Sequence, residues 1–259
     1  MKNFLKIFFL IIFFIGHSLN SFSAEKVEYL KTDWSFKGLF GKFDRGALQR
    51  GYQVYTEVCS SCHSMKYVSY RNLAEKGGPE FSEAQAKAIA ASFEVKDGPN
   101  ADGEMFTRPG KLSDKFVMPY ENVKAAQAAN GGAYPPDMSV LAKARGGGVD
   151  YIYSLLQGYD DPPAGFMLDD GVYYNKFMYG NKIKMSNQLS DGLVEYADGT
   201  NATVEQMSKD VTTFLMWTAE PHLEARHQMG FKAIVYLIIL TILVYFSMKR
   251  IWSRIETEV

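Results

Sequence analysis

The sequence predicts a mainly α-helical, loop-rich domain followed by one C-terminal transmembrane helix. Short helical patterns alternate with clusters of Gly, Pro and Asp along most of the 259 residues, without an internal repeat or a low-complexity tract. A long apolar run follows at residues 231–248. At 1.5 Å per residue this run reaches about 27 Å, which is enough for one membrane span.

The N-terminus has the pattern of an export signal, which we assign to residues 1–24. Lys2 and Lys6 form a short positive region, residues 7–15 are apolar, and small residues at 21–24 form a cleavage zone. A retained anchor is the alternative, but the apolar core is too short to cross roughly 30 Å of hydrocarbon. The leader lacks the Arg- and Ser-rich amphipathic pattern of a mitochondrial transit peptide, so we expect a bacterial periplasm.

Three helices are expected in the domain that follows. The first covers residues 51–58. Ser82 with Gln85 fits a capping box that opens the second, which runs through about residue 94. Thr203 with Gln206 fits another capping box, and apolar residues then recur at helical spacing until about ten residues before the apolar run. The third helix should therefore hold the domain close to the membrane.

The domain, residues 25–230, is large enough to build its own core and is mildly acidic. It holds 22 Lys and Arg against 27 Asp and Glu, a formal net charge of −5. Such a balance suits a basic soluble protein partner, although a solvated acidic surface is the commoner explanation of a modest excess. We expect no nucleic-acid partner.

The charges around the apolar run predict its orientation. Lys232 near its start can extend its ammonium group outward, and Lys249, Arg250 and Arg254 follow its end. By the positive-inside rule, residues 249–259 lie in the cytoplasm and the domain lies outside. A buried core helix is the alternative, which is disfavoured because the run is apolar all round. Aromatic residues stand where a membrane interface would place them, at Tyr236, Tyr245 and Trp252.

The most specific motif is Cys59-Ser60-Ser61-Cys62-His63, which is typical of covalent haem attachment. On a helical turn both thiols lie on one face and can bond one porphyrin, with His63 as the proximal iron ligand. A zinc site would need four ligands, and a thiol redox pair would leave His63 unexplained. The chain has two cysteines, so one haem c consumes both.

The sixth iron ligand separates an electron carrier from a haem catalyst. His222 and His227 lie next to the apolar run, so a thioether is the better candidate, and Met ligation raises the haem potential. Composition does not choose among the 12 methionines. Most of them, including Met207 and Met216, are expected to fill the core.

Many stretches in one order give the chain a family resemblance over residues 34–252. They include Gly-Tyr-Gln-Val-Tyr at 51–55, Val-Cys-Ser-Ser-Cys-His-Ser-Met at 58–65, Tyr-Arg-Asn-Leu at 70–73, Asp-Gly-Pro-Asn at 97–100, Arg-Pro-Gly-Lys-Leu-Ser-Asp at 108–114, Pro-Pro-Asp at 135–137, Ala-Arg-Gly-Gly at 144–147, Lys-Asp-Val at 209–211 and Ala-Glu-Pro at 219–221. On these stretches the chain resembles the cytochrome c1 family, the haem c subunits of quinol–cytochrome c oxidoreductase (bc1) complexes. The resemblance implies a class I cytochrome c-like domain with insertions.

The resemblance also implies the remaining site residues. The family's axial methionine corresponds to Met185, and its haem-propionate arginine corresponds to Arg145, whose planar fork suits a carboxylate. Gly146-Gly147-Gly148 beside it lacks the Gly-Lys-Ser/Thr of a phosphate loop. Further positions match residues that line the family's haem pocket: Asn130, Pro135, Pro136, Tyr151 and Leu155.

One departure from the family concerns the methionine loop. The family commonly follows this methionine with Ala-Pro-Pro, whereas Ser186-Asn187-Gln188 follow Met185 here. Because prolines restrict the chain, we expect this loop to be less rigid.

The function implied by the resemblance is outer-sphere electron transfer, with no catalytic chemistry on this chain alone. The implied partners are a cytochrome b subunit, a Rieske iron–sulfur protein that donates electrons, and a soluble or membrane-tethered cytochrome c that accepts them, within a dimeric complex of the bacterial inner membrane. Alternatives are a free-standing membrane-anchored cytochrome c shuttle, a catalytic haem protein with open iron, and a structural haem in a binding module. The long interval from His63 to Met185 argues against the shuttle, because a minimal cytochrome c has a shorter one.

Overall fold

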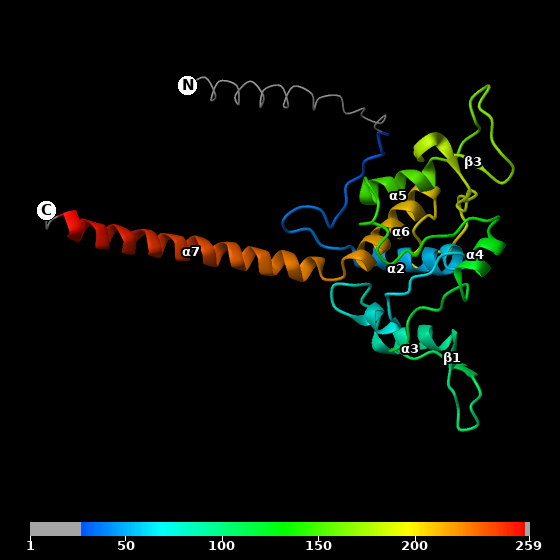
Figure 1. The fold of residues 1–259 in the computed structure, drawn as a ribbon, viewed down its shortest axis with the longest axis horizontal. Coiled ribbons are helices and arrows are strands. Elements are labelled where there is room, and N and C mark those ends of the chain that lie inside the picture. Colours follow the sequence, from blue (N-terminus) through cyan, green and yellow to red (C-terminus); the bar gives the residue numbers. More distant parts are fainter. Residues whose placement is uncertain (1–26, 257–259) are drawn as a thin grey trace, which may run out of the picture.

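The computed structural model describes residues 27–256, so the predicted leader at 1–24 lies outside the described residues. The fold is mainly helical with long loops, as the sequence predicted, and a single long helix extends from the domain (Figure 1). In chain order the elements are α2 (Arg45–Val54), η1 (Tyr55–Cys59), η2 (Tyr70–Ala74), α3 (Glu83–Ala91), β1 (Glu94–Asp97), β2 (Phe106–Pro109), α4 (Val123–Ala129), α5 (Gly148–Gln157), β3 (Tyr173–Tyr174), η3 (Tyr179–Asn181), β4 (Lys182–Ile183), α6 (Val204–Ala219) and α7 (Leu223–Glu256).

The first predicted helix starts earlier than expected. Asp44 caps α2 by accepting a hydrogen bond from the Ala47 amide at 3.1 Å. The prediction placed an α-helix through residue 58, but the chain widens into the π-helical turn η1, where the Ser60 amide donates to the Tyr55 carbonyl at 2.8 Å. The hydrophobic pattern does not distinguish this five-residue hydrogen bond from an α-helical one. The wide turn ends at Cys59, the first residue of the cysteine motif. Such turns are frequent at functional sites.

The centre of the domain is the contact between α2 and α6. Gly51 allows it, because a Cβ added there would lie 2.2 Å from the Asp210 carbonyl oxygen. Next to it the Arg50 guanidinium binds the fully buried Asp210 carboxylate with two hydrogen bonds, of 2.8 and 3.1 Å. Asp198 accepts a third hydrogen bond from Arg50 at 2.7 Å. The ion pair ties the two helices together where their backbones meet.

Aromatic rings fill the space between these helices and the loops around them. Phe116 lies 4.9 Å from Tyr70 and 6.1 Å from Tyr55, measured between ring centroids. Phe214 of α6 lies 5.9 Å from Tyr55 and 5.5 Å from Trp217. All five are almost fully buried, so this aromatic core supports η1 and the motif that follows it.

The second predicted helix is confirmed at its start and is shorter at its end. The Ser82 side chain accepts from the Gln85 amide, and the Gln85 side chain accepts from the Ser82 amide, as a capping box requires. Helix α3 ends at Ala91, and β1 begins at Glu94, where we expected helix. β1 pairs antiparallel with β2, and this hairpin projects from one side of the domain (Figure 1).

The third predicted helix corresponds to α6, although only half of its capping box forms. The Thr203 hydroxyl accepts from the Gln206 amide at 3.1 Å. The Gln206 side chain turns inward instead and donates to Asp210 at 3.0 Å. The buried carboxylate of Asp210 has capacity for this further donor, which explains why the reciprocal cap is absent.

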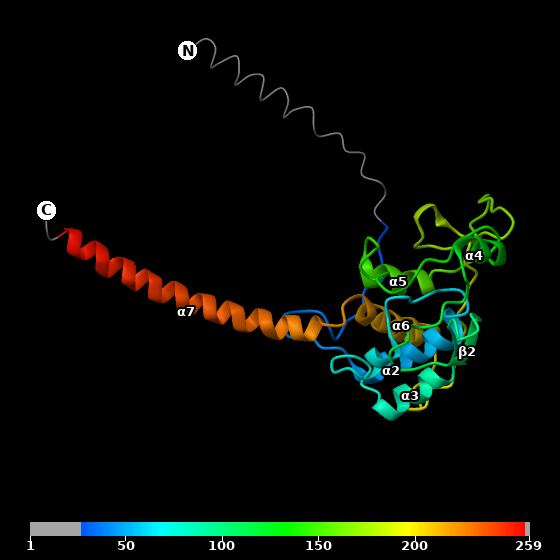
Figure 2. The ribbon, with the colours of Figure 1, turned by 60° about the horizontal axis from the view of Figure 1, so that its bottom comes forward.

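Helix α7 begins earlier than the predicted span and continues through it. Three residues separate it from α6, where we expected about ten. Its apolar window has a mean hydropathy of 2.2 and none of that window is buried, which excludes a buried core helix. Figure 2 shows α7 leaving the domain as one uninterrupted helix. By length and composition it can cross a membrane.

Candidate functional site

The cysteine motif forms one compact turn after η1. The amides of Cys62 and His63 both donate to the Cys59 carbonyl, at 3.1 and 2.9 Å. The two thiols are free and only partly exposed. Burial raises the pKa of the Cys59 thiol to about 12, and the neighbouring Cys62 adds to this shift. The Cys59 sulfur is therefore held as a neutral thiol, and the two sulfurs are not bonded to each other.

His63 is buried and its ring is oriented by a backbone carbonyl. Its Nδ1 lies 2.9 Å from the carbonyl oxygen of Pro136. A carbonyl only accepts, so Nδ1 carries the proton and Nε2 keeps its lone pair for a metal. Burial lowers the pKa of His63, which favours this neutral form, although the bond to Pro136 and the charge of Asp137 oppose the shift. The predicted pocket residue Pro136 thus acts through its main chain.

Asp137 connects the chain segment after His63 to the segment that contains Pro136. It was not among the predicted site residues. One of its oxygens accepts from the Ser64 hydroxyl at 2.8 Å and from the Lys66 amide at 3.0 Å. The other accepts from the Ser139 amide at 3.0 Å. The segment after the motif is thereby fastened to the segment that carries the Pro136 carbonyl. The Pro-Pro-Asp stretch at 135–137 was the only signal for it in the sequence.

A groove with a volume of about 180 Å³ opens beside Cys62. The hydroxyl of Tyr120 lies 3.9 Å from the Cys62 sulfur, and the Asn130 amide donates to that hydroxyl at 3.1 Å. The predicted residue Asn130 is therefore connected to the motif through Tyr120, which sequence reasoning missed. Apolar side chains of the groove wall are left exposed at Met118, Val123 and Tyr134. Pro135 lines the same groove.

Met185 follows β4 and is partly buried. The hydroxyl of Tyr159 donates to its main-chain carbonyl at 2.9 Å. The Lys184 ammonium group beside it donates to the Gly131 carbonyl at 3.1 Å. This contact brings the methionine segment against the residues that follow Asn130. Neither Tyr159 nor Lys184 had a sequence signal that marked it as supporting the site.

A buried asparagine connects the methionine segment to α5. The Asn175 side-chain amide donates to the main-chain carbonyl of Leu155 at 2.8 Å. Leu155, a predicted pocket residue, therefore contributes through its main chain. Asn181 in turn donates to the Asn175 carbonyl at 3.1 Å. The C-terminal end of α5 and the loop that precedes Met185 therefore form one hydrogen-bonded unit.

Tyr151 has a different partner, the second methionine of this loop. Its hydroxyl lies 3.5 Å from the sulfur of Met178, to which it can donate. The Tyr151 ring also makes an edge contact with Tyr29 at 5.5 Å between centroids. The Met178 sulfur is thus engaged by a donor, whereas the Tyr159 hydrogen bond to Met185 is on the backbone and leaves the Met185 sulfur available.

Arg145 is exposed and makes no ion pair with any carboxylate of the described residues. Its guanidinium donates to the Ala144 carbonyl at 3.1 Å. Burial raises the pKa of Tyr151, and the positive charge of Arg145 opposes that shift, which means that the two side chains are close. Arg145 therefore offers an unpaired guanidinium on the Tyr151 side of the site.

The chemistry of this donor set fits a haem. Two free thiols, an imidazole with an available Nε2, a thioether and exposed apolar side chains are what a covalently bound, six-coordinate haem needs. The described residues contain no group of three or more His, Cys, Asp or Glu side chains that could hold a bare metal ion. The zinc interpretation of the motif therefore finds no support in residues 27–256.

Comparisons with known proteins agree with this chemistry. The profile of the cytochrome C1 family matches residues 34–255. The cytochrome b/c1 of Bradyrhizobium diazoefficiens is 53% identical over 239 aligned residues, which cover 85% of this chain and 35% of that protein. Cytochrome c1-2 of Solanum tuberosum, a mitochondrial haem protein, is 49% identical over 225 residues, with 87% and 85% covered. Cytochrome c1 of Rhodospirillum rubrum is 47% identical over 242 residues, with 87% and 88% covered. The chain thus spans about a third of the Bradyrhizobium protein and most of the other two.

Proposed function

The chain belongs to the cytochrome c1 family, and from this premise we propose that it is the electron-carrying haem c subunit of a bacterial bc1 complex. The observation that carries the proposal is the His63 ring, whose Nδ1–H is held by the Pro136 carbonyl. That hydrogen bond leaves Nε2 as a ligand directly after two free thiols. Membership of the family supports a haem at this position, and the free thiols support its covalent attachment.

Attachment uses Cys59 and Cys62. Each thiol would add across one vinyl group of the haem, so that a sulfur–carbon bond forms and the thiol hydrogen passes to the other vinyl carbon. The addition is balanced without an oxidant. The raised pKa of Cys59 supports the need for assistance at this step, because a neutral thiol is a poor nucleophile.

His63 and Met185 are the residues that would hold the haem iron. A haem bound there would supply one-electron chemistry, by change between its ferrous and ferric states. The protein residues keep the site closed: Pro136 orients the His63 ring, and Tyr159 and Lys184 restrain the backbone around Met185. A closed pair of ligands excludes oxygen and other small ligands, which suits electron transfer.

The remaining predicted residues line the proposed pocket. Arg145 would pair with a haem propionate, since its guanidinium has no carboxylate partner among the described residues. Asn130 and Pro135 lie on the Cys62 side, by way of Tyr120 and the groove. Tyr151 and Leu155 lie on the α5 side, next to the methionine loop.

The proposed topology has a leader at 1–24 that is removed, a periplasmic haem domain at 25–230, an anchor at 231–248 and a cytoplasmic tail at 249–259. The apolar α7 supports a membrane anchor, and the positive charges after it support this orientation. The proposed partners are cytochrome b, a Rieske iron–sulfur protein as electron donor and a cytochrome c as acceptor, in a dimeric complex.

Intact-mass analysis of the purified full chain tests covalent attachment. The expected mass is that of the mature chain plus one haem, and it survives denaturation and acid extraction. A variant with both Cys59→Ala and Cys62→Ala should lose that added mass. A wild-type chain that releases its haem on extraction would contradict the proposal.

A further inference from the structure

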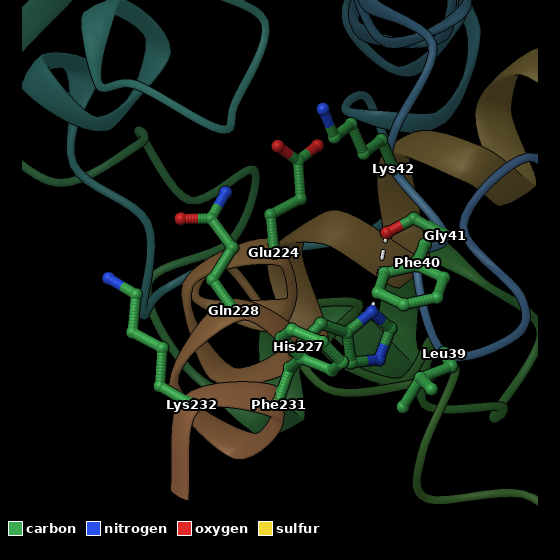
Figure 3. Close-up of a pocket in the computed structure, with 9 residues that line it drawn as sticks. All are labelled: Leu39, Phe40, Gly41, Lys42, Glu224, His227, Gln228, Phe231 and Lys232. Atoms are coloured by element: carbon green, nitrogen blue, oxygen red, sulfur yellow. Dashed lines mark hydrogen bonds between the residues drawn. The ribbon is translucent and has the colours of Figure 1, made fainter. Parts of the chain in front are cut away.

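The N-terminal segment, residues 29–43, runs along the domain before α2 begins and contacts two helices that are far from it in the sequence. At its C-terminal end the Phe43 amide donates to Glu224 of α7 at 2.9 Å, and the Gly41 carbonyl lies 3.3 Å from Nδ1 of His227. Figure 3 shows this end of the segment lying against one face of α7. The other end of the segment lies on α5, next to the predicted haem pocket.

Three polar contacts fix the segment on α5. The Leu30 amide donates to the Ser154 hydroxyl at 2.8 Å. The Trp34 indole donates to the Asp150 carboxylate at 2.5 Å, and the Lys37 ammonium group donates to the same carboxylate at 3.2 Å. Ser154 is fully buried and Trp34 is only 5% exposed. The segment is therefore a packed part of the domain and not a loose tail.

Tyr29 is the residue of this segment that reaches the predicted pocket. Its ring meets the ring of Tyr151 edge to face, at 5.5 Å between centroids and an interplanar angle of 68°. Burial raises the pKa of Tyr151, and the neighbouring Tyr29 adds to that rise. The Tyr151 hydroxyl in turn lies 3.5 Å from the Met178 sulfur. Tyr29 therefore packs directly against a residue that the sequence placed in the haem pocket.

Gly147 provides the space for the Tyr29 ring. A Cβ added at Gly147 would collide with the Cε2 and Cδ2 atoms of Tyr29 and would lie 3.1 Å from the Cβ of Tyr151. The φ of Gly147 is +84°, a left-handed conformation that glycine adopts without steric cost. Gly147 directly precedes α5 and stands two positions after Arg145. The Tyr29 ring thus lies against the backbone turn that carries Arg145.

We propose that Tyr29 is a positioning residue for the haem, which acts through Tyr151 and through the turn that carries Arg145. The inference rests on the proposed function, because it requires a haem propionate beside Arg145. The Tyr29 ring contacts both Tyr151 and the Gly147 backbone, so it limits the movement of each. A guanidinium held beside a propionate offsets its negative charge, and a cation near the haem favours the more negative, reduced state. Loss of the Tyr29 ring should therefore lower the haem potential.

Potentiometric titration of the haem-loaded full chain in mild detergent tests the proposal. Tyr29→Leu keeps an apolar side chain without an aromatic edge, and Tyr29→Phe keeps the ring. At the midpoint potential of the wild type, we expect the ratio of reduced to oxidised haem to fall roughly threefold in Tyr29→Leu. Tyr29→Phe should restore the wild-type ratio. An unchanged ratio in Tyr29→Leu, or an equal fall in both variants, would overturn the proposal.

Leu30→Ala is the matched control within the same segment. The Leu30 side chain is 40% exposed, and the main-chain amide that holds the segment on Ser154 remains in this variant. It should keep the wild-type ratio, and a fall equal to that in Tyr29→Leu would assign the effect to loosening of the whole segment and overturn the proposal. Intact mass is recorded in parallel. A wild type without covalent haem would contradict the proposed function, whereas covalent haem with an unchanged potential in Tyr29→Leu would contradict the positioning role alone.

Discussion

The phenol of Tyr159 donates a 2.9 Å hydrogen bond to the main-chain carbonyl of Met185. The bond restrains the backbone of Met185 and leaves its sulfur free.

The loop after Met185, which we expected to be less rigid, has hydrogen bonds of its own. The Gln188 side chain donates to the Ser186 hydroxyl at 2.6 Å, and Asn187 accepts from the Leu189 amide at 3.2 Å. Local hydrogen bonds thus occupy the place of the family's prolines. A less rigid loop remains a prediction.

Replacement of Tyr159 by Phe should weaken Met185 ligation without removing it. One neutral hydrogen bond is worth about 1 kcal/mol, which corresponds to a roughly fivefold larger fraction of open haem. Carbon monoxide binding to the reduced protein measures that fraction. The matched control is Tyr173→Phe, on the partly exposed β3. Equal effects of the two variants would refute the positioning role of Tyr159.

Replacement of Met185 by Leu should keep the haem covalently bound, lower its potential and open the iron to carbon monoxide. Axial ligands set haem potentials over roughly 0.8 V, and we expect a fall on the order of 0.1 V. Potentiometric titration measures it. Met178→Leu is the control, since the Met178 sulfur is engaged by Tyr151 at 3.5 Å. An unchanged potential in Met185→Leu, or the same fall in Met178→Leu, would disprove the ligand assignment.

The sequence indicated the attachment motif because its geometry is local, and covalent attachment of a haem there stays a prediction. Cys59, Cys62 and His63 lie on one turn, and no distant contact is needed to recognise them. The ring orientation of His63 was beyond sequence reasoning, because it depends on a carbonyl 73 residues away. The roles of Tyr120 and Tyr159 were also beyond sequence reasoning, because only the fold brings Tyr120 next to Cys62 and Tyr159 next to Met185. Met185 itself came from the family resemblance and not from spacing.

Helix ends show the same division between local and distant causes. The Ser82 cap was predictable because both of its partners lie within three residues. The side-chain partner of Gln206 was not predictable, because that side chain donates to the buried Asp210 and not to the helix cap. The strand that begins at Glu94 depends on pairing with Pro109, which helical periodicity does not report.

Replacement of Asp210 by Asn should destabilise the domain strongly. Asp210 is fully buried, and removing one partner of such a pair leaves the Arg50 guanidinium partly uncompensated, at a cost of about 3 kcal/mol. Chemical denaturation in detergent, followed by circular dichroism, measures the loss. Asp198→Asn removes an exposed partner of the same guanidinium and should cost less than about 1 kcal/mol. Equal losses would show that burial of the pair contributes nothing.

Acid should release the β1–β2 hairpin. Arg108 donates a hydrogen bond to Asp114 at 2.6 Å. The hydrogen bonds from Arg108, and to a smaller extent the one from the Lys111 amide, lower the pKa of Asp114 from 3.8 to about 2. A depressed folded-state pKa contributes stability above the ordinary pKa, and this is lost as the pH falls from about 4 to about 2. The protection of the amides of residues 94–109, measured relative to their intrinsic exchange rate at each pH, should fall over that window.

The hairpin prediction has its own control in Asp114→Asn. This variant should show low amide protection already at neutral pH and a smaller further loss in acid than the wild type, because Asp97, the other carboxylate bound by Arg108, is the remaining partner that titrates. A wild-type hairpin that is equally protected at both pH values would rule out the anchoring role of Asp114.

We expect electrons from quinol to pass through a haem held by Cys59, Cys62, His63 and Met185. The most direct measurement is rapid mixing of quinol with the complex purified through a C-terminal tag, followed at the absorption of c-type haem. We expect b-type haem and an iron–sulfur protein to co-purify, and the c-type haem to be reduced at a rate that a quinol-site inhibitor abolishes. A c-type haem that purifies alone and is not reduced by quinol would contradict the account and favour a free-standing shuttle.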